Sequence, residues 1–238
     1  MDELDTPNHI YQISTINALV SGLYDGCVSL SKLLQKGNFG IGTFKGLDGE
    51  LTLLDGIFYR TRPDGTIYVC SKNDFVPFAV ITEFENYDIH DIHDLNSYHD
   101  IQEKFDSLIE STNVFYAFYI EGKFNYVRTR TVVKQEMPYK PMAEAVKNQP
   151  IFEYKDIDGY IVGFRCPSFI KGINVPGYHF HFVSKDKKFG GHISELSIKN
   201  ATAFVQNCSC FRMEIPENES FYNMEVKDRS DEIKEVEK

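Results

Sequence analysis

GYHFHFVSKDKKFGGH, the stretch from Gly177 to His192, contains three of the seven histidines in this chain. Alternate residues of a β-strand point to the same face, so His179 and His181 project together while their aromatic neighbours cover the other face. The polar run SKDKKFGG predicts a loop that brings the chain back as a neighbouring strand near His192. The stretch therefore predicts a pair of strands that gathers His179, His181 and His192.

These three imidazoles form a candidate metal site. Neutral imidazoles suit Zn²⁺ or a similar divalent ion, and three protein ligands leave a coordination position open to water or substrate. An open position is typical of a catalytic site rather than a structural one. Histidines that face solvent on an edge strand would give the same pattern, and the residues alone leave that alternative open.

Short strands and tight turns continue on both sides of this stretch. Before it, β-branched and aromatic runs are separated by Asp-Gly pairs at 48–49, 55–56 and 64–65, which are strong hairpin signals. We expect another turn at Glu121-Gly122, inside NVFYAFYIEGKFNYVRTRTV. Helices are expected within 15–35, as two short pieces, and near 101–110 and 140–149, but they do not alternate with the strands. The fold class is therefore α+β, β-rich, with mostly antiparallel pairing.

The composition limits the classes of partner. A net charge of −10 over 238 residues argues against nucleic acid and against an anionic membrane surface. No run approaches the ~18 apolar residues that a membrane-spanning helix needs, and the first residues show no signal peptide, so we expect a cytoplasmic protein. Five widely spread cysteines do not fit a disulfide framework, and we expect buried, reduced thiols.

A second group of histidines also has metal-like spacing. His90, His93 and His99 occur in HDIHDLNSYH, within a polar and acidic stretch. Such a stretch is typical of an exposed loop followed by the start of a helix. We therefore expect these three histidines to be solvated rather than bound to a metal.

Two other stretches place charged side chains on predicted strands. Glu50 follows an Asp-Gly turn at the start of an apolar strand, where a carboxylate can act as a ligand, a base or an acid. Arg128 and Arg130 share one face of the strand NYVRTRTV, and arginine pairs with carboxylates through two hydrogen bonds. An exposed hairpin carboxylate and a pair of surface arginines are the alternative interpretations.

Three stretches, in this order, closely resemble bacterial α-acetolactate decarboxylase: GTFKGLDGELTLLDGIFYR, YVRTRTVVKQEMPYKPM and GYHFHFVSKDKKFGGHI. The resemblance extends from about Tyr11 to Glu237. It implies a zinc site formed by the three histidines of the last motif. It also implies further site residues, which are Thr43, Glu50, Arg130 and a glutamate of the C-terminal tail, either Glu237 or, as the alternative, Glu235.

The same resemblance implies the architecture. We expect two domains that each contain a mixed or antiparallel sheet, at residues 1–135 and 136–238, with the metal site between them. The second domain would carry the histidine triad and a tail that returns to the site. A cytoplasmic homodimer without an organic cofactor is also implied.

The implied reaction converts (S)-2-acetolactate into (R)-acetoin and CO₂. Zn²⁺, or another divalent ion, would stabilise the negative charge that develops on the substrate as CO₂ leaves. Arg130 would pair with the substrate carboxylate, Thr43 would contact the substrate, and Glu50 or Glu237 would deliver the proton. Two other classes remain open, namely a different zinc-dependent lyase or hydrolase on this scaffold and a non-catalytic metal-binding β module.

Overall fold

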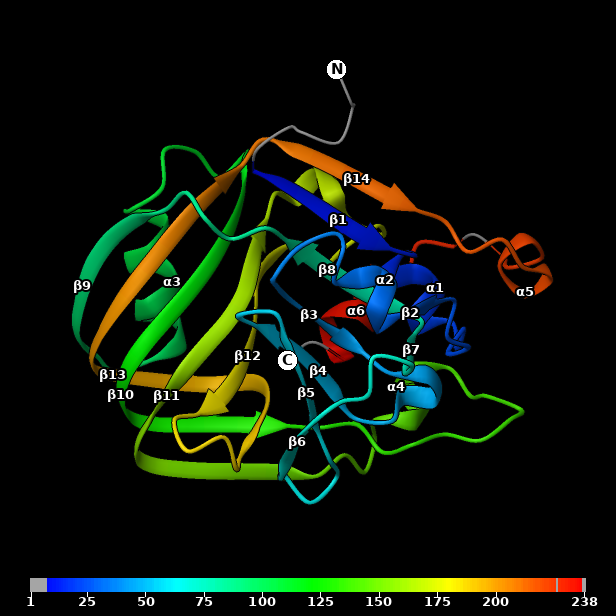
Figure 1. Ribbon diagram of the computed structural model, residues 1–238, viewed down its shortest axis with the longest axis horizontal. Helices are drawn as coiled ribbons and strands as arrows, with labels where there is room; N and C mark the ends of the chain where they lie inside the picture. The colour runs from blue at the N-terminus through cyan, green and yellow to red at the C-terminus, as the bar shows by residue number, and fades with distance from the viewer. Residues whose placement is uncertain (1–7, 226, 237–238) are drawn as a thin grey trace.

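The computed structural model describes residues 8–225 and 227–236 and contains two large sheets packed against each other (Figure 1). The first sheet has seven strands in the order β14-β1-β8-β3-β4-β5-β6, and only the β1–β14 pair is parallel. Its strands are β1 His9–Ile13, β3 Phe39–Thr43, β4 Glu50–Leu54, β5 Ile57–Thr61, β6 Ile67–Val69, β8 Phe78–Thr82 and β14 Cys210–Glu214. A short separate pair is formed by β2 Val28–Ser29 and β7 Phe75–Val76.

The second sheet is antiparallel and has the order β10-β11-β12-β13-β9. Its strands are β9 Asp88–Leu95, β10 Phe115–Arg130, β11 Ile151–Cys166, β12 Gly177–Ser184 and β13 Gly190–Cys208. Because β13 also pairs with β10, the four strands β10 to β13 close into a ring, and β9 extends the sheet outside it. The long strands bend strongly, as Figure 1 shows for β10, β11 and β13.

Short helices cover the sheets. They are α1 Ile16–Val20, α2 Leu30–Leu33, α3 Tyr98–Asp106, α4 Met142–Ala145, α5 Glu219–Tyr222 and α6 Ser230–Val236, with 3₁₀ turns at Lys45–Leu47 and Ser168–Ile170. The longest, α3, begins at a capping box in which Ser97 and Asp100 each accept a backbone N–H of the other. Its Ile101 and Phe105 are buried in the core of the second sheet, so α3 closes that side of the ring.

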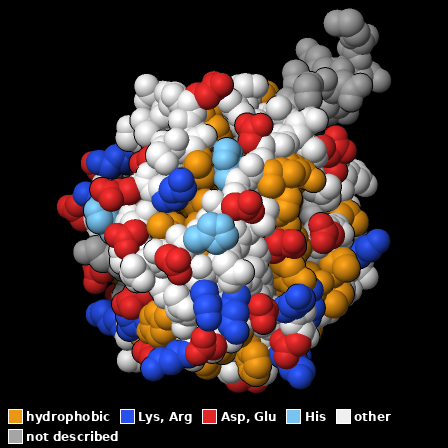
Figure 2. Space-filling model, turned by 90° about the vertical axis from the view of Figure 1, so that its left-hand side faces the viewer, with side chains coloured by type: hydrophobic (Ala, Val, Ile, Leu, Met, Phe, Trp, Pro, Cys, Tyr) orange, Lys and Arg blue, Asp and Glu red, His pale blue; other side chains and the backbone are white. Residues whose placement is uncertain are grey.

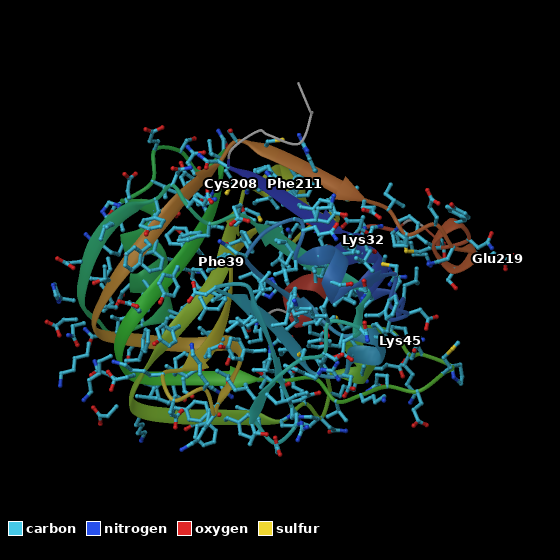
Figure 3. All side chains as sticks on the ribbon, in the orientation of Figure 1. Lys32, Phe39, Lys45, Cys208, Phe211 and Glu219 are labelled. Atoms are coloured by element: carbon cyan, nitrogen blue, oxygen red, sulfur yellow. The ribbon has the colours of Figure 1, made fainter. Side chains whose placement is uncertain are left out.

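The core between the sheets contains side chains from both. Phe39 of β3 meets Phe164 of β11 edge to face, with 6.0 Å between ring centroids, and Cys208 of β13 lies in the same core (Figure 3). Ile16 of α1 and Ile233 of α6 complete it. Full burial of a side chain such as Phe39 contributes about 1.5–3 kcal/mol to stability, so this shared core fixes the two sheets relative to each other.

The structure confirms the α+β, β-rich fold class. It also confirms the Asp-Gly turns, and the turn between β4 and β5 shows why they are needed. Asp55 and Gly56 have φ values of 51° and 73°, and two successive positive φ values are what a two-residue type I′ hairpin requires. The helical region near residues 15–35 is divided into α1 and α2, as its glycines predict.

Two of the expectations are wrong. Glu121-Gly122 is not a turn, because β10 runs through it and Gly122 pairs with Ala201 of β13. A Cβ at Gly122 would lie 2.4 Å from the Asn200 carbonyl oxygen, so this glycine permits close approach of two strands. The polar stretch around His90 and His93 is not a loop but strand β9, which pairs with β13 and buries Ile92.

The strand pairing mixes the two expected domains. The second sheet takes β9 and β10 from residues 1–135 and the other three strands from 136–238, while β14 returns to the first sheet. Pairing does not test which segments fold independently, so the division at residue 135 stays a prediction. Among the described residues, no helix combines the length and the apolar character needed to cross a membrane.

Candidate functional site

The three histidines of the triad lie side by side on one face of the second sheet. His179 and His181 belong to β12, and His192 at the start of β13 is the direct cross-strand neighbour of His181. One ligand nitrogen from each side chain lies within 4.8 Å of the other two. His181 and His192 are buried and His179 is partly buried, so the group is largely removed from water. The structure thus brings together the three residues that the sequence predicts.

The orientation of His181 is fixed from outside the triad. Its Nδ1 lies 2.9 Å from the carbonyl oxygen of Leu51, which can only accept a hydrogen bond, so Nδ1 carries the hydrogen. The hydroxyl of Thr52 lies 3.3 Å from the same nitrogen. The Nε2 lone pair of His181 is therefore directed into the site, which is the arrangement a metal-binding histidine needs.

Burial keeps the imidazoles of His179 and His181 neutral. Desolvation, with a smaller contribution from the charge of Arg130, lowers the pKa of His179 to about 3. Desolvation also holds the pKa of His181 well below its usual range, although the hydrogen bond to Leu51 opposes the shift. A metal binds only the neutral imidazole. Three converging imidazoles, two of which are held neutral in this way, therefore fit a divalent ion such as Zn²⁺.

The first sheet contributes Thr43 and Glu50, which are direct neighbours on β3 and β4. Both are buried, and Glu50 Oε2 lies 3.8 Å from Nε2 of His181. The hydroxyl of Thr43 donates a 2.9 Å hydrogen bond to the carbonyl of Gly49. A small cavity of about 30 Å³ is lined by Thr43, Glu50, Arg130 and the triad. The candidate site therefore lies between the two sheets.

Arg130 occupies the end of β10, where it is the cross-strand neighbour of His192. It is buried, and its guanidinium donates to the side-chain oxygen of Gln149 at 3.3 Å and to the backbone carbonyl of Val236. Arg128 is less buried and forms an ion pair with Glu195 at 2.7 Å. Of the two arginines, Arg130 alone lines the cavity at the triad, whereas both line a larger pocket beside it.

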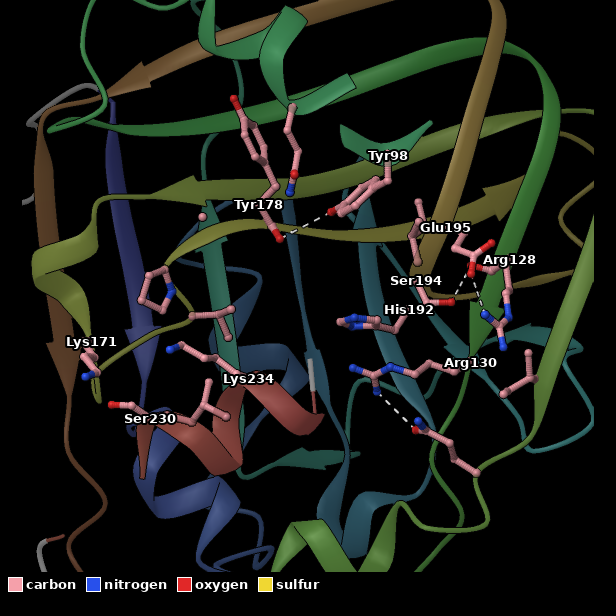
Figure 4. A pocket seen from close by; sticks show the side chains of 18 of the residues that line it. Tyr98, Arg128, Arg130, Lys171, Tyr178, His192, Ser194, Glu195, Ser230 and Lys234 are labelled. Atoms are coloured by element: carbon pink, nitrogen blue, oxygen red, sulfur yellow. Dashed lines mark hydrogen bonds and ion pairs between the residues drawn. The ribbon is translucent and has the colours of Figure 1, made fainter. Parts of the chain in front are cut away.

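That larger pocket leads to the site from outside. It has a volume of about 840 Å³ and shares Arg130 and His192 with the small cavity. Figure 4 shows these two side chains next to each other, with Lys234 of α6 on one side and Tyr98 on the other. The pocket gives a small molecule room to approach the triad.

The C-terminal segment returns to the site. The Val236 carbonyl accepts from Arg130, and Val236 and Ile233 are buried in the core between the sheets. Glu235 is exposed on α6. Glu237, the other tail glutamate, lies outside the described residues. The contact of Val236 with Arg130 therefore supports the sequence prediction that the tail returns to the site.

His90, His93 and His99 form no comparable group. Among the described residues, the triad is the one group of three or more His, Cys, Asp or Glu side chains whose ligand atoms converge. His93 and His99 are exposed, and His99 lies 3.4 Å from Glu103. Figure 2, which faces the β9 side of the molecule, shows histidine side chains among acidic ones on an open surface.

Sequence reasoning did not identify several residues of the site. Gln149 and the carbonyls of Leu51 and Val236 orient the charged groups, but a backbone carbonyl leaves no sequence signal. Thr52 was detectable, because it shares the face of Glu50 two residues away. The apolar wall of the small cavity was also missed and consists of Ile16, Leu19, Phe78, Val132 and Met142.

Comparisons of this chain with known proteins, by sequence and by structure, point to one family. Residues 10–228 match the family model described as alpha-acetolactate decarboxylase. Proteins of that name are 40% identical over 96% of this chain and 80% of the relative in Methanosarcina mazei, and 41% identical over 97% and 90% in Bacillus subtilis. The crystal structure of alpha-acetolactate decarboxylase from Bacillus subtilis strain 168 superposes with a TM-score of 0.93 at 40% identity, covering 96% of this chain and 99% of that chain.

Proposed function

The chain belongs to the alpha-acetolactate decarboxylase family, and from this membership we propose that it is an enzyme that decarboxylates acetolactate at the histidine triad. The observation that carries the proposal is the convergence of three imidazoles within 4.8 Å, beside a buried arginine and a buried glutamate. A metal site, a group that pairs with a carboxylate and a proton donor are what the reaction needs. The charge of Arg130 suits an anionic substrate despite the negative net charge of the chain.

His179, His181 and His192 would hold the metal, and we propose Zn²⁺ because three imidazoles with an open position suit it. A bound divalent ion supplies Lewis-acid stabilisation of negative charge on the oxygen atoms of a substrate. The carbonyl of Leu51 contributes by keeping the Nε2 lone pair of His181 directed into the site. The buried position of the triad strengthens electrostatic interactions, because little water screens them.

Arg130 is proposed to pair with the carboxylate of acetolactate. The bond from the central carbon to CO₂ then breaks, and its electron pair moves through the new C=C bond onto the oxygen of the adjacent ketone to give an enediolate. Gln149 and the Val236 carbonyl hold the guanidinium in place, so the Arg130 side chain loses little conformational entropy when the substrate binds. Thr43 lines the same cavity and is proposed to contact the substrate.

The product forms when a proton is added to carbon, and we propose Glu50 as the donor, with Glu237 as the alternative. Glu50 is buried beside His181 and lines the small cavity at the triad, so its carboxyl is within reach of a substrate bound there. A donor fixed on one side of a planar enediolate adds the proton to one face and so gives one enantiomer of acetoin; we propose (S)-2-acetolactate as substrate and (R)-acetoin as product, as the family resemblance implies. The apolar wall that includes Phe78 and Met142 contains no group that could add a proton from its side.

Metal analysis combined with a product assay tests this proposal. Purified protein is expected to contain a divalent metal equimolar with the chain and to release CO₂ and acetoin from racemic acetolactate. Chelation is expected to abolish turnover, and added Zn²⁺ to restore it. Full turnover by metal-free protein would refute the proposed site. Bound metal without acetoin would instead favour another zinc-dependent enzyme or a non-catalytic metal-binding module.

A pair of variants locates the metal on the triad. His181→Ala is expected to lose the metal and with it more than about a hundredfold in kcat/KM, because second-shell support alone is worth 10–100-fold. His93→Ala changes an exposed histidine of β9 and should retain both metal and activity. Equal metal content in the two variants would show that the metal is bound elsewhere.

We further propose a cytoplasmic homodimer, as the family resemblance implies. Analytical ultracentrifugation of the active enzyme tests the dimer, and a sedimentation coefficient of a single chain at the assay concentration would contradict it.

A further inference from the structure

We propose that Arg60 is a positioning residue for this reaction, because through Asp48 it fixes the turn that places Glu50 and Thr43. The proposal rests on the function proposed for the site. Arg60 touches neither the triad nor the small cavity. It acts from the opposite face of the first sheet.

The turn between β3 and β4 has an uncommon backbone. Gly46, Leu47 and Gly49 have φ values of 71°, 53° and 90°, so positive values occur at three of four successive residues. Residues held in such conformations, Leu47 above all, cost stability and persist only where surrounding structure fixes them. The hydroxyl of Thr43 donates to the carbonyl of Gly49, and Glu50 follows directly. Movement of this turn would therefore displace both site residues.

Arg60 holds the turn between β3 and β4 in place. Its Nη1 donates to Oδ2 of Asp48 at 2.8 Å, and its Nη2 lies 3.2 Å from Oδ2 of Asp74. Its guanidinium carbon lies 3.8 Å from the centroid of the buried Phe44 ring. Only 11% of the Arg60 side chain is exposed, so these contacts are screened less than those of a surface pair. One planar guanidinium thus joins the turn to strand β5, which carries Arg60, and to the segment around Asp74, which an ammonium group does not do equally well.

The strand register shows how this contact reaches the site. Arg60 of β5 pairs with Leu51 of β4, and Thr61 pairs with Glu50. Side chains of paired residues share a face, and Leu51 is buried in the core on the far side of the sheet from the triad. Asp48 precedes Glu50 by two residues, and the carbonyl of Leu51 accepts from His181. The Arg60–Asp48 pair therefore holds the stretch that provides the proton donor and orients a metal ligand.

Two changes at Arg60 test the proposal, with one control. Arg60→Met keeps the apolar stem but removes both ion pairs, while Arg60→Lys keeps the charge. Arg62→Met is the matched control, because Arg62 is exposed and stacks on Tyr68 at 4.1 Å. Metal content, melting temperature, kcat, KM and the enantiomeric excess of acetoin are measured for each. The visible spectrum of the Co²⁺-substituted protein reports the geometry around the ion independently of activity.

Arg60→Met is expected to lower kcat per metal-loaded chain about tenfold, with KM within about twofold, because a donor misplaced by an ångström costs far more in rate than in binding. Its enantiomeric excess should fall and its Co²⁺ spectrum should shift. Arg60→Lys should lie between Arg60→Met and the wild type, and Arg62→Met should match the wild type.

A folded, metal-loaded Arg60→Met protein with wild-type kcat, enantiomeric excess and Co²⁺ spectrum would overturn the proposal, even if its melting temperature fell. If Arg60→Met does not fold, Asp48→Asn, which keeps the size of the side chain, is judged by the same criteria. If the wild type forms no acetoin, the proposed function fails, but the Co²⁺ spectra still decide whether Arg60 controls the geometry of the site.

Discussion

At the scale of single residues, the site depends on how each charged or ligating group is held. Arg130 is the clearest case, because its guanidinium donates to Gln149 and to the carbonyl of Val236 and still lines the cavity at the triad. A lysine ammonium is a point charge and cannot serve such separated acceptors while also pairing with a carboxylate.

Arg130→Lys is therefore expected to lower kcat/KM by more than about tenfold at unchanged metal content, which is about 1.4 kcal/mol of transition-state stabilisation. Arg128→Lys is the matched control, because Arg128 forms an ion pair with the exposed Glu195. Its kcat/KM should stay within about twofold, since exposed pairs contribute about 0–1 kcal/mol. Steady-state kinetics with metal analysis checks both variants, and a loss below tenfold at Arg130 would exclude the proposed carboxylate pairing.

Many of the residues that form the candidate site could be predicted from the sequence. The alternation of β-strands places His179 and His181 on one face, and the hairpin places His192 beside them. Thr43, Glu50 and Arg130 followed from the family motifs, because position alone also fits surface residues. The carbonyls of Leu51 and Val236 could not be predicted, since any residue type supplies a carbonyl and only the folded chain decides where it points.

At the scale of elements, the turn from β12 into β13 sets the position of His192. Gly190 and Gly191 precede it, and a Cβ at Gly191 would lie 2.7 Å from the carbonyl oxygen of Arg130. Gly191 also has a φ of 140°, which disfavours other residues. This close approach lets β13 pair with β10 and β12 at the same point, so that one residue neighbours both Arg130 and His181.

Gly191→Ala is expected to destabilise the fold by about 1–3 kcal/mol, because it adds a clash to a strained backbone position. It should also weaken metal binding by displacing His192. Gly177→Ala is the control, because Gly177 has a φ of 85° but its Cβ would have no atom within 4 Å. Chemical denaturation and metal titration compare the two, and equal metal affinities would show that the turn does not position His192.

The two errors at this scale have one cause. Glycine and polar residues usually mark turns and loops, but long-range pairing overrides that tendency where β13 lies alongside. Gly122 sits inside a long strand because a side chain there would collide with β13. The stretch around His93 becomes β9 because Ile92 is buried against the same partner. Neither pairing is visible in the local sequence.

At the scale of the whole molecule, the site joins two sheets. The triad and Arg130 come from the second sheet, whereas Thr43 and Glu50 come from the first. Alternation and turn signals were enough to predict a β-rich α+β fold. They could not predict that β9 and β10 join the later strands or that β14 returns to β1, because such pairings depend on contacts between distant segments.

Removing the metal is expected to lower the melting temperature by about 5–10 °C, since a ligand at a hundred times its dissociation constant contributes about 2.7 kcal/mol. Calorimetry with and without a chelator measures the change. His181→Ala provides the control, because its melting temperature should not respond to Zn²⁺. Identical melting temperatures for metal-loaded and metal-free wild type would contradict a metal bound within the fold.

The direct pairing of Arg130, His192 and His181 along one row of the second sheet has an evolutionary consequence. The regular spacing of paired strands fixes these three side chains relative to one another. Their distance from Glu50 depends instead on how the aromatic side chains around Phe39 position one sheet against the other. Substitutions in that layer can therefore change both the position of Glu50 and, through the carbonyl of Leu51, the orientation of His181. Core residues that touch no substrate are thus under selection for activity as well as for stability.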